Sequence, residues 1–179
     1  MIKRLQFNRT AKQKKRIYDA TDIARYVIKY CNEQYTDISH MKLQKLLYFI
    51  QAFFLVEIEK GYGYPAFSDR IEAWESGPVV PAVYEEFKLY GALPNIPHKN
   101  SYLIPDPKSH WSIKRVNYDD SMISEHNKKG IIEIVDYFKD WATNDLVKLT
   151  HRQEPWENAY SHGANTEIRT KEIKEYFSE

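Results

Sequence analysis

The chain has 179 residues, of which 42% are hydrophobic and 15% aromatic, and its 26 basic and 25 acidic residues nearly cancel. This length and aromatic content exclude an intrinsically disordered protein and indicate one folded domain, or one domain with a tail. The small net charge excludes a global attraction to nucleic acid or anionic lipid, so only a local patch could provide one.

A single cysteine, Cys31, allows no disulfide within the chain and no cysteine-based zinc site. One thiol suits a reducing cytosol, and the N-terminus lacks the apolar core of a signal peptide. The most apolar stretch, residues 46–56, is shorter than the about 20 residues that a membrane-spanning helix needs. We therefore expect a cytoplasmic protein without membrane contact.

Residues 1–16 form a basic segment that carries no acidic residue. Such like-charge runs are usually solvated, mobile arms. The alternative is an electrostatic handle for an acidic protein or for nucleic acid, although no aromatic residues interleave residues 9–16 to stack on bases. We treat residues 1–16 as an N-terminal arm and residues 17–179 as a single helical domain.

The first helix is expected to begin near Asp19 or Thr21, because either side chain can accept a hydrogen bond from a free N–H group of the first turn. Apolar residues then recur on one side at helical spacing: Ile23, Ala24, Val27, Ile28 and Cys31. Cys31 completes this stripe, which favours a packing role over a nucleophilic or redox role.

The second helix is expected to follow a cap at Asp37 or Ser39 and to end at Gly61. Its apolar stripe covers more than about 100° of its circumference, which is typical of a central core helix. The stripe consists of Leu43, Leu46, Leu47, Ile50, Phe53, Phe54 and Ile58. A narrow strip is expected to face solvent: Lys45, Ala52 and Glu59. A polar row of Gln44, Tyr48 and Gln51 predicts a structural hydrogen-bond network, with a binding groove as the alternative.

The predicted β-structure is a small two-stranded element. Residues 67–74 alternate imperfectly between apolar and polar and predict a short strand. Residues 92–120 contain four prolines and are expected to form a loop, which is unusually long for a compact domain. Within it, residues 110–116 are expected to form a second strand that pairs with the first.

Further helices are expected between and after these segments. One covers residues 81–90, with Pro81 in its first turn and Gly91 just beyond its last. Another carries apolar residues at helical spacing: Ile131, Ile134, Val135, Phe138 and Trp141. A final helix starts at Thr170 and docks on the body. The sequence thus predicts a mainly α-helical, compact multi-helix domain around the central hydrophobic helix.

The chain shows no recognisable catalytic or metal-binding pattern. A Gly-x-Ser-x-Gly elbow, a phosphate-binding glycine loop and the zincin arrangement of histidines are all absent from the sequence. The spacing of His151, Glu154 and His162 does not demand a shared metal, and Glu72 and Glu75 are expected to be solvated carboxylates. We therefore expect a binding protein that is no enzyme, with no cofactor and no metal.

Three sequence blocks together resemble one family. They are "KLQKLLYF" at residues 42–49, "IEAWESGPVVPAVYEEF" at residues 71–87 and "LTHRQEPWENA" at residues 149–159. In this order they are similar to the Panacea domain, also called the SocA-like or phage-associated protein domain. The similarity extends from about Tyr18 to Phe177, which leaves the basic arm outside it.

This resemblance implies a mostly helical domain found in prophages and in bacterial toxin–antitoxin operons. Members of the family act as antitoxins that neutralise unrelated toxins, generally by direct protein contact, and one kind delivers its toxin to a protease. The implied partner is a cognate toxin protein, with a protease in the adaptor case. A nucleic-acid-binding regulator that uses residues 1–16 is the alternative function.

The residues expected to contact a partner lie in the three blocks: Lys45, Tyr48, Trp74, Glu75, Gly77, Pro78, His151 and Trp156. Trp74 and Glu75 combine an aromatic anchor with a charge, and interface hot spots favour Trp, Tyr and Arg. The alternative for Trp74 is a core residue that packs over the start of the next helix.

Overall fold

The structure is a computed structural model that describes residues 15–91, 93–108, 110 and 112–178. Most of the predicted basic arm, residues 1–14, lies outside the described residues. Its predicted role as a mobile arm or an electrostatic handle therefore stays a prediction.

Helices dominate the described part of the chain, and the strands form two small antiparallel sheets. The α-helices are α1 (Ala20–Glu33), α2 (His40–Val56), α3 (Pro81–Phe87), α4 (Glu125–Phe138), α5 (Thr143–His151), α6 (Glu154–Ser161) and α7 (Thr170–Phe177), and a 3-10 turn, η1 (Lys88–Tyr90), extends α3. The strands are β1 (Ile71–Trp74), β2 (Gly77–Val79), β3 (Ser101–Pro105), β4 (Ile113–Asn117) and β5 (Thr166–Ile168). The predicted fold class, mainly α-helical with a small β element, is confirmed.

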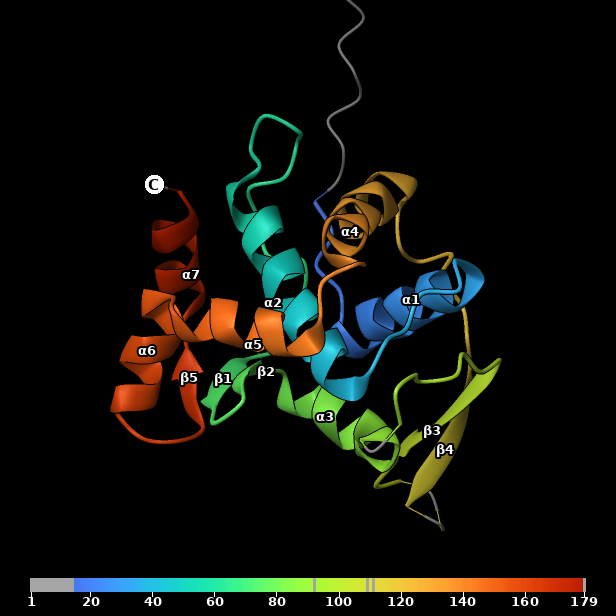
Figure 1. Cartoon of the computed structure of the whole chain (residues 1–179). Coiled ribbons are helices and arrows are strands. Elements are labelled where there is room, and N and C mark those ends of the chain that lie inside the picture. The colour runs from blue at the N-terminus through green and yellow to red at the C-terminus, as the bar shows by residue number, and fades with distance from the viewer. Residues whose placement is uncertain (1–14, 92, 109, 111, 179) are drawn as a thin grey trace, which may run out of the picture.

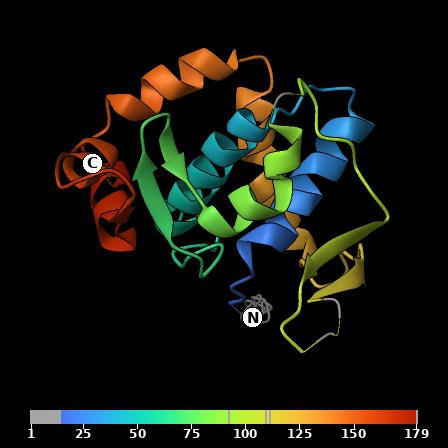
Figure 2. The same ribbon diagram turned by 90° about the horizontal axis from the view of Figure 1, so that it is seen from below.

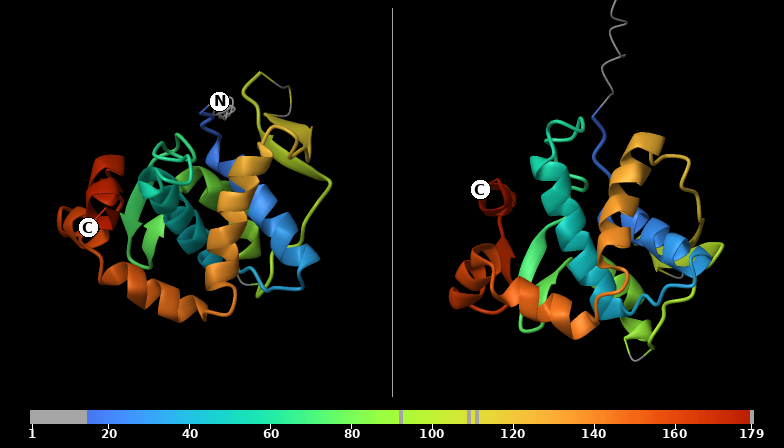
Figure 3. Two further views of the ribbon diagram at one scale, coloured as in Figure 1. Left: turned by 90° about the horizontal axis from the view of Figure 1, so that it is seen from above. Right: turned by 45° about the horizontal axis from the view of Figure 1, so that its top comes forward.

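α2 lies at the centre of the molecule, with the other helices arranged around it (Figures 1 and 3). It contacts α1, α3, α4, α5, α7 and β2. Leu47, Ile50 and Phe54 have no exposed surface, and burying each such side chain contributes about 1.5–3 kcal/mol. Ser39, one of the two predicted caps, accepts a hydrogen bond from the Lys42 N–H group at 3.2 Å. The predicted role of this helix as the core of the fold is confirmed.

α2 ends earlier than predicted, at Val56 instead of Gly61. The N–H groups of Gly63 and Tyr64 donate to the Phe54 carbonyl oxygen at 2.7 and 3.1 Å, so this acceptor is used by the returning chain and not by a further helical turn. Ile58, which was expected in the buried stripe, is consequently 65% exposed.

The predicted solvent-facing strip of α2 is also wrong. Lys45 is completely buried and Ala52 is 2% exposed, because neighbouring elements cover this side of the helix too. Only Glu59 is exposed, and it lies beyond the end of the helix.

The strands pair differently from the prediction. β1, inside the predicted segment 67–74, pairs with β2 and with β5, and the register places Ala73 opposite Pro78 and Thr166. β4 overlaps the predicted segment 110–116 but pairs with β3, across a short loop within the region predicted to lack structure. The local hairpin forms because pairing of neighbouring segments closes a much shorter loop. This hairpin lies at the periphery, at the opposite end from α6 and α7 (Figure 2).

An ion pair between α1 and α3 fixes the position of α3 beside α2. The Arg25 guanidinium donates to both carboxylate oxygens of Glu86, at 2.8 and 2.7 Å, and both side chains are 9% exposed. A bidentate pair of this kind is stronger than a single surface contact.

Among the described helices, none is long and apolar enough to cross a membrane.

Candidate partner-binding site

The three sequence blocks meet at the turn between β1 and β2. Lys45 of α2 donates a hydrogen bond from Nζ to the Pro78 carbonyl oxygen at 2.9 Å. Trp156 of α6 donates from Nε1 to the Trp74 carbonyl oxygen at 3.0 Å. Residues from the first and third blocks therefore hold the backbone of the second block from two sides.

Gly77 allows this close approach. Its φ of +98° lies in the left-handed region, where a side chain is strained. A Cβ atom at this position would lie 2.7 Å from Thr150 Oγ1 and 2.9 Å from Lys45 Nζ. Glycine is thus required both by the turn and by the side chains packed against it.

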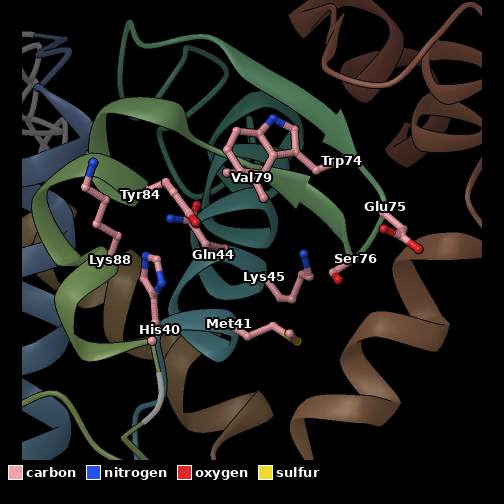
Figure 4. Close-up of a pocket in the computed structure, with 11 residues that line it drawn as sticks. His40, Met41, Gln44, Lys45, Trp74, Glu75, Ser76, Val79, Tyr84 and Lys88 are labelled. Carbon is pink, nitrogen blue, oxygen red and sulfur yellow. The ribbon is translucent and has the colours of Figure 1, made fainter.

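A pocket of about 380 Å³ opens beside this turn. His40, Gln44 and Lys45 line it from α2, and Trp74 and Tyr84 line it from β1 and α3 (Figure 4). His40 and Gln44 share one side of α2 because they are four residues apart. Met41, Glu75, Ser76 and Lys88 add exposed side chains to the lining, and Val79 and Gly91 complete it.

Lys45 is the most unusual residue of this site. Its side chain is completely buried, and no carboxylate oxygen within the described residues lies within 4 Å of Nζ. Burial lowers the pKa of Lys45 to about 7, because a charged ammonium group loses its hydration there without gaining a counter-charge. At pH 7 the amine of Lys45 is therefore only partly protonated, and it has no ionic partner within the described residues.

Two neighbouring polar groups also lack partners. Gln44 accepts a hydrogen bond at Oε1 from the Val80 N–H group at 2.8 Å, which fixes its amide. Gln44 Nε2 and His40 Nε2 are buried and find no hydrogen-bond partner within the described part of the chain. Burial and then the charge of Lys45 lower the pKa of His40, so its imidazole is neutral at pH 7.

His151 and Trp156 form an aromatic stack behind the turn. Their ring centroids are 4.0 Å apart, and Tyr160 continues the stack on the other face of Trp156 at 4.8 Å. Burial and then the Lys45 charge lower the pKa of His151, while a hydrogen bond with the Glu75 backbone acts in the opposite direction. The stack ties α5 and α6 to the turn.

Trp74 combines features of an interface residue with features of a core residue. Its side chain is half-buried, its Nε1 donates to Glu72 Oε2 at 2.9 Å, and its ring packs against Tyr84 with centroids 4.8 Å apart. Trp74 is therefore held in place by the fold and still presents surface to the pocket.

The structure brings most of the predicted contact residues together. Lys45, Trp74 and Glu75 line the pocket. The other predicted residues lie at the adjoining turn or contact it: Gly77, Pro78, His151 and Trp156. Tyr48 is different, because it is completely buried and packs against Phe49 and Phe177. Its hydroxyl group has no hydrogen-bond partner within the described residues.

The sequence did not predict His40, Tyr84 and Lys88 as pocket residues. Gln44 was predicted to belong to a polar row that forms a hydrogen-bond network, with a binding groove as the alternative. The sequence did contain a signal for His40 and Gln44, because they are polar residues four positions apart on a largely apolar helix. Tyr84 and Lys88 gave no signal, since their place in the pocket depends on how α3 packs.

A second, apolar groove of about 420 Å³ lies along the C-terminal half of α2. Phe49 and Phe53 line it from α2, and Tyr137 and Trp141 border it from the region of α4. Tyr137 is 68% exposed and Trp141 39% exposed, although Trp141 was predicted to continue a buried stripe. Trp141 follows the end of α4 at Phe138 and so leaves the helical face.

No group of three or more His, Cys, Asp or Glu side chains within the described ranges is arranged to hold a metal ion.

The fold and the site define a small, mainly helical domain whose central helix lies between a polar pocket and an apolar groove. The family described as "Antitoxin SocA-like, Panacea domain" matches residues 43–157, well over half of the chain. The chain belongs to this family, so the resemblance stated from the sequence is confirmed.

Similarity to individual proteins is more limited. The chain is 46% identical over 54 residues to a protein named Antitoxin SocA from Caulobacter vibrioides (strain NA1000 / CB15N). This alignment covers 30% of the chain and 27% of that relative. No solved structure matches the chain.

Proposed function

We propose that the chain is an antitoxin that neutralises a cognate toxin by direct protein–protein contact in the cytoplasm. Membership of the antitoxin SocA-like family over residues 43–157 is the observation that carries this proposal. The name of the Caulobacter relative, an antitoxin, agrees with it. The toxin's identity follows from neither observation, so the proposal names a partner by role only.

The contact is proposed to centre on the pocket beside the β1–β2 turn. Trp74 and Tyr84 offer half-buried aromatic surface there, and such side chains are frequent hot spots in interfaces. The turn is anchored by Lys45 and Trp156 from two helices, so the contact surface is largely formed before binding. A rigid surface loses less conformational entropy on association.

Masking of the toxin in a stable complex is the mechanism proposed. Masking requires only that the complex persists, whereas delivery to a protease also removes the toxin. The toxin's half-life in cells separates these mechanisms, and masking predicts that it does not shorten when the chain is present.

Co-expression with the product of the neighbouring gene tests the function. That product alone should arrest growth, the chain should restore growth, and the two proteins should elute together from a sizing column. A harmless neighbouring product, continued toxicity beside the chain, or rescue without a complex would each contradict the proposal.

A matched pair of variants tests the location of the contact. Trp74→Ala should weaken complex formation by about tenfold or more, because hot-spot truncation costs about 2 kcal/mol. Leu103→Ala is the control, since Leu103 is 62% exposed on β3, in the peripheral hairpin. Equal effects of the two substitutions would place the contact elsewhere.

A further inference from the structure

We infer that the pocket beside the β1–β2 turn binds a carboxylate group, and that the toxin supplies it from an acidic side chain. That the toxin supplies the carboxylate rests on the proposed function, whereas carboxylate binding by the pocket does not.

Lys45 lacks a nearby counter-charge in the described part of the chain. Within the described residues Nζ has one acceptor, the Pro78 carbonyl oxygen, although an ammonium group has three hydrogens to donate. Buried cations are normally paired, because an unpaired one is strongly destabilised. Glu75 also lines the pocket, but its carboxylate lies more than 4 Å from Nζ, so a carboxylate from outside would supply the close ion pair that Lys45 lacks within the described residues.

Two buried side chains of the pocket also have nitrogen atoms without a hydrogen-bond partner within the described residues. Gln44 is 3% exposed and His40 is 6% exposed, and both line the same pocket as Lys45. The amide of Gln44 already uses its oxygen on the Val80 N–H group, so its free Nε2 can only donate. The neutral imidazole of His40 can also donate from Nε2 in one of its tautomers. As donors, these groups and Lys45 match the acceptor-only character of an ionised carboxylate. Their nitrogen atoms are buried, so binding requires these side chains to rotate toward the ligand.

The size and charge of the pocket also suit a carboxylate. The volume of about 380 Å³ lies near the lower end of the range for ligand pockets, so it suits one or two side chains. One buried ammonium group balances the single negative charge of a carboxylate, whereas a phosphate group would bring nearly two. Trp74 and Tyr84 provide apolar walls for the methylene groups of a glutamate.

Because carboxylate binding is coupled to the protonation of Lys45, its affinity should depend on pH. The titratable groups around Lys45 are His40 from its own helix, His151 from α5, Glu75 from the turn and Lys88 from η1. The lowered pKa values leave both histidines neutral above pH 7, so Lys45 is the group whose charge changes there. A bound carboxylate raises the pKa of Lys45, and binding must therefore weaken as the pH rises above 7.

Two blocked amino acids serve as probes: N-acetyl-glutamate N-methylamide and its glutamine counterpart. Titrated into the full chain at millimolar concentrations and followed by NMR, the glutamate probe should bind about tenfold more tightly than the glutamine probe, as expected for a charge-assisted contact. Its affinity should fall by about fivefold or more between pH 6.5 and pH 8.5. Equal binding of the two probes, or no binding of either, would overturn the inference.

The signals of the lysine side chains provide a readout that needs no mutation. The titration midpoint of Lys45 should move to higher pH when the glutamate probe is added. Lys42 is the internal control, because it is buried on the same helix and donates to a backbone carbonyl oxygen, that of Lys139, at 2.6 Å. Lys42 lines a different pocket, so its midpoint should not move. A shift of both lysines, or of neither, would contradict a specific site.

Substitution of the same two lysines extends the comparison to the toxin. Lys45→Met should abolish glutamate binding and weaken the toxin complex by about tenfold, whereas Lys42→Met should change each by less than about twofold. If the toxin complex tolerates Lys45→Met, the toxin does not supply the bound carboxylate, and the antitoxin proposal still stands. Failure of the unmodified chain to neutralise any toxin would remove the proposed function, while the probe titrations would still decide carboxylate binding.

Discussion

The two halves of α2 line two different concave sites, the polar pocket and the apolar groove. The N-terminal half presents His40, Gln44 and Lys45 to the polar pocket, and the C-terminal half presents Phe49 and Phe53 to the apolar groove. Both sets of side chains are buried to at least 91%, so burial alone does not distinguish them. The polar pocket is lined by two donors and an amine without full partners, whereas the lining of the apolar groove leaves one buried polar atom, Gln153 Oε1, without a partner within the described residues. The proposed carboxylate site accounts for this difference, since apolar packing alone would serve stability better.

The comparison between Gln51 and Gln44 should give the largest effect. Gln51 accepts from the Ala66 and Phe67 N–H groups and donates to the Phe67 carbonyl oxygen, so all its contacts are internal. Gln51→Met should lower the free energy of unfolding by about 4 kcal/mol, because three buried backbone groups lose their partner. Gln44→Met removes one such contact and should cost about 1 kcal/mol. Urea denaturation measures both, and equal losses would contradict the distinction.

The charge of Lys45 should make stability depend on pH. The folded-state pKa of about 7 lies below the ordinary value of 10.5, so between these pH values the unfolded chain binds more protons than the folded chain. Stability should therefore rise with pH through this window, by at most about 1.4 kcal/mol per unit.

The Lys45→Met variant should lose this rise, and urea denaturation at pH 7, 8 and 9 measures it. Lys148→Met is the control, because Lys148 is 70% exposed and should keep the unmodified slope. A slope that survives Lys45→Met would show that another group causes it.

The turn between the strands should be sensitive to one methyl group. Gly77→Ala places a Cβ atom against Thr150 and Lys45 in a left-handed conformation, and should cost about 2–3 kcal/mol. Thermal unfolding provides the measurement. Gly163→Ala is the matched control, because its φ of +130° is also positive but its nearest contact would be an ordinary 3.8 Å. A loss no greater than that of Gly163→Ala would show that backbone strain alone explains the effect.

The apolar groove should give the smallest effect. Tyr137 is 68% exposed, so Tyr137→Ala should change the free energy of unfolding by less than about 0.5 kcal/mol. Neutralisation of the toxin should also survive this substitution, because the proposed contact is the pocket. Loss of neutralisation with unchanged stability would move the contact to the groove.

The sequence predicted the elements with strong helical periodicity and missed features that depend on packing. The stripe of Leu47, Ile50 and Phe54 is long and regular, so the central helix could be predicted. Lys45 was placed in solvent because a lysine is rarely buried, and the approach of the β1–β2 turn gave no sequence signal. β5 has only three residues and pairs with a strand about 90 residues earlier, which short-range patterns cannot show.

The sequence blocks nevertheless identified most of the site. Trp74, Gly77 and His151 were selected for their place in a family pattern, and the structure gathers them around one turn. The pocket itself could not be predicted, because its walls come from α2, β1 and α3, whose mutual placement depends on the Arg25–Glu86 pair and on the core.

Hydrogen exchange of the chain, alone and in complex with its toxin, tests the central claim most directly. We predict that toxin binding slows exchange of the backbone amides in residues 74–91, which form the turn and the part of the pocket wall that lies outside α2. Protection confined to residues 134–141 beside the apolar groove, or no protection at residues 74–91, would contradict it.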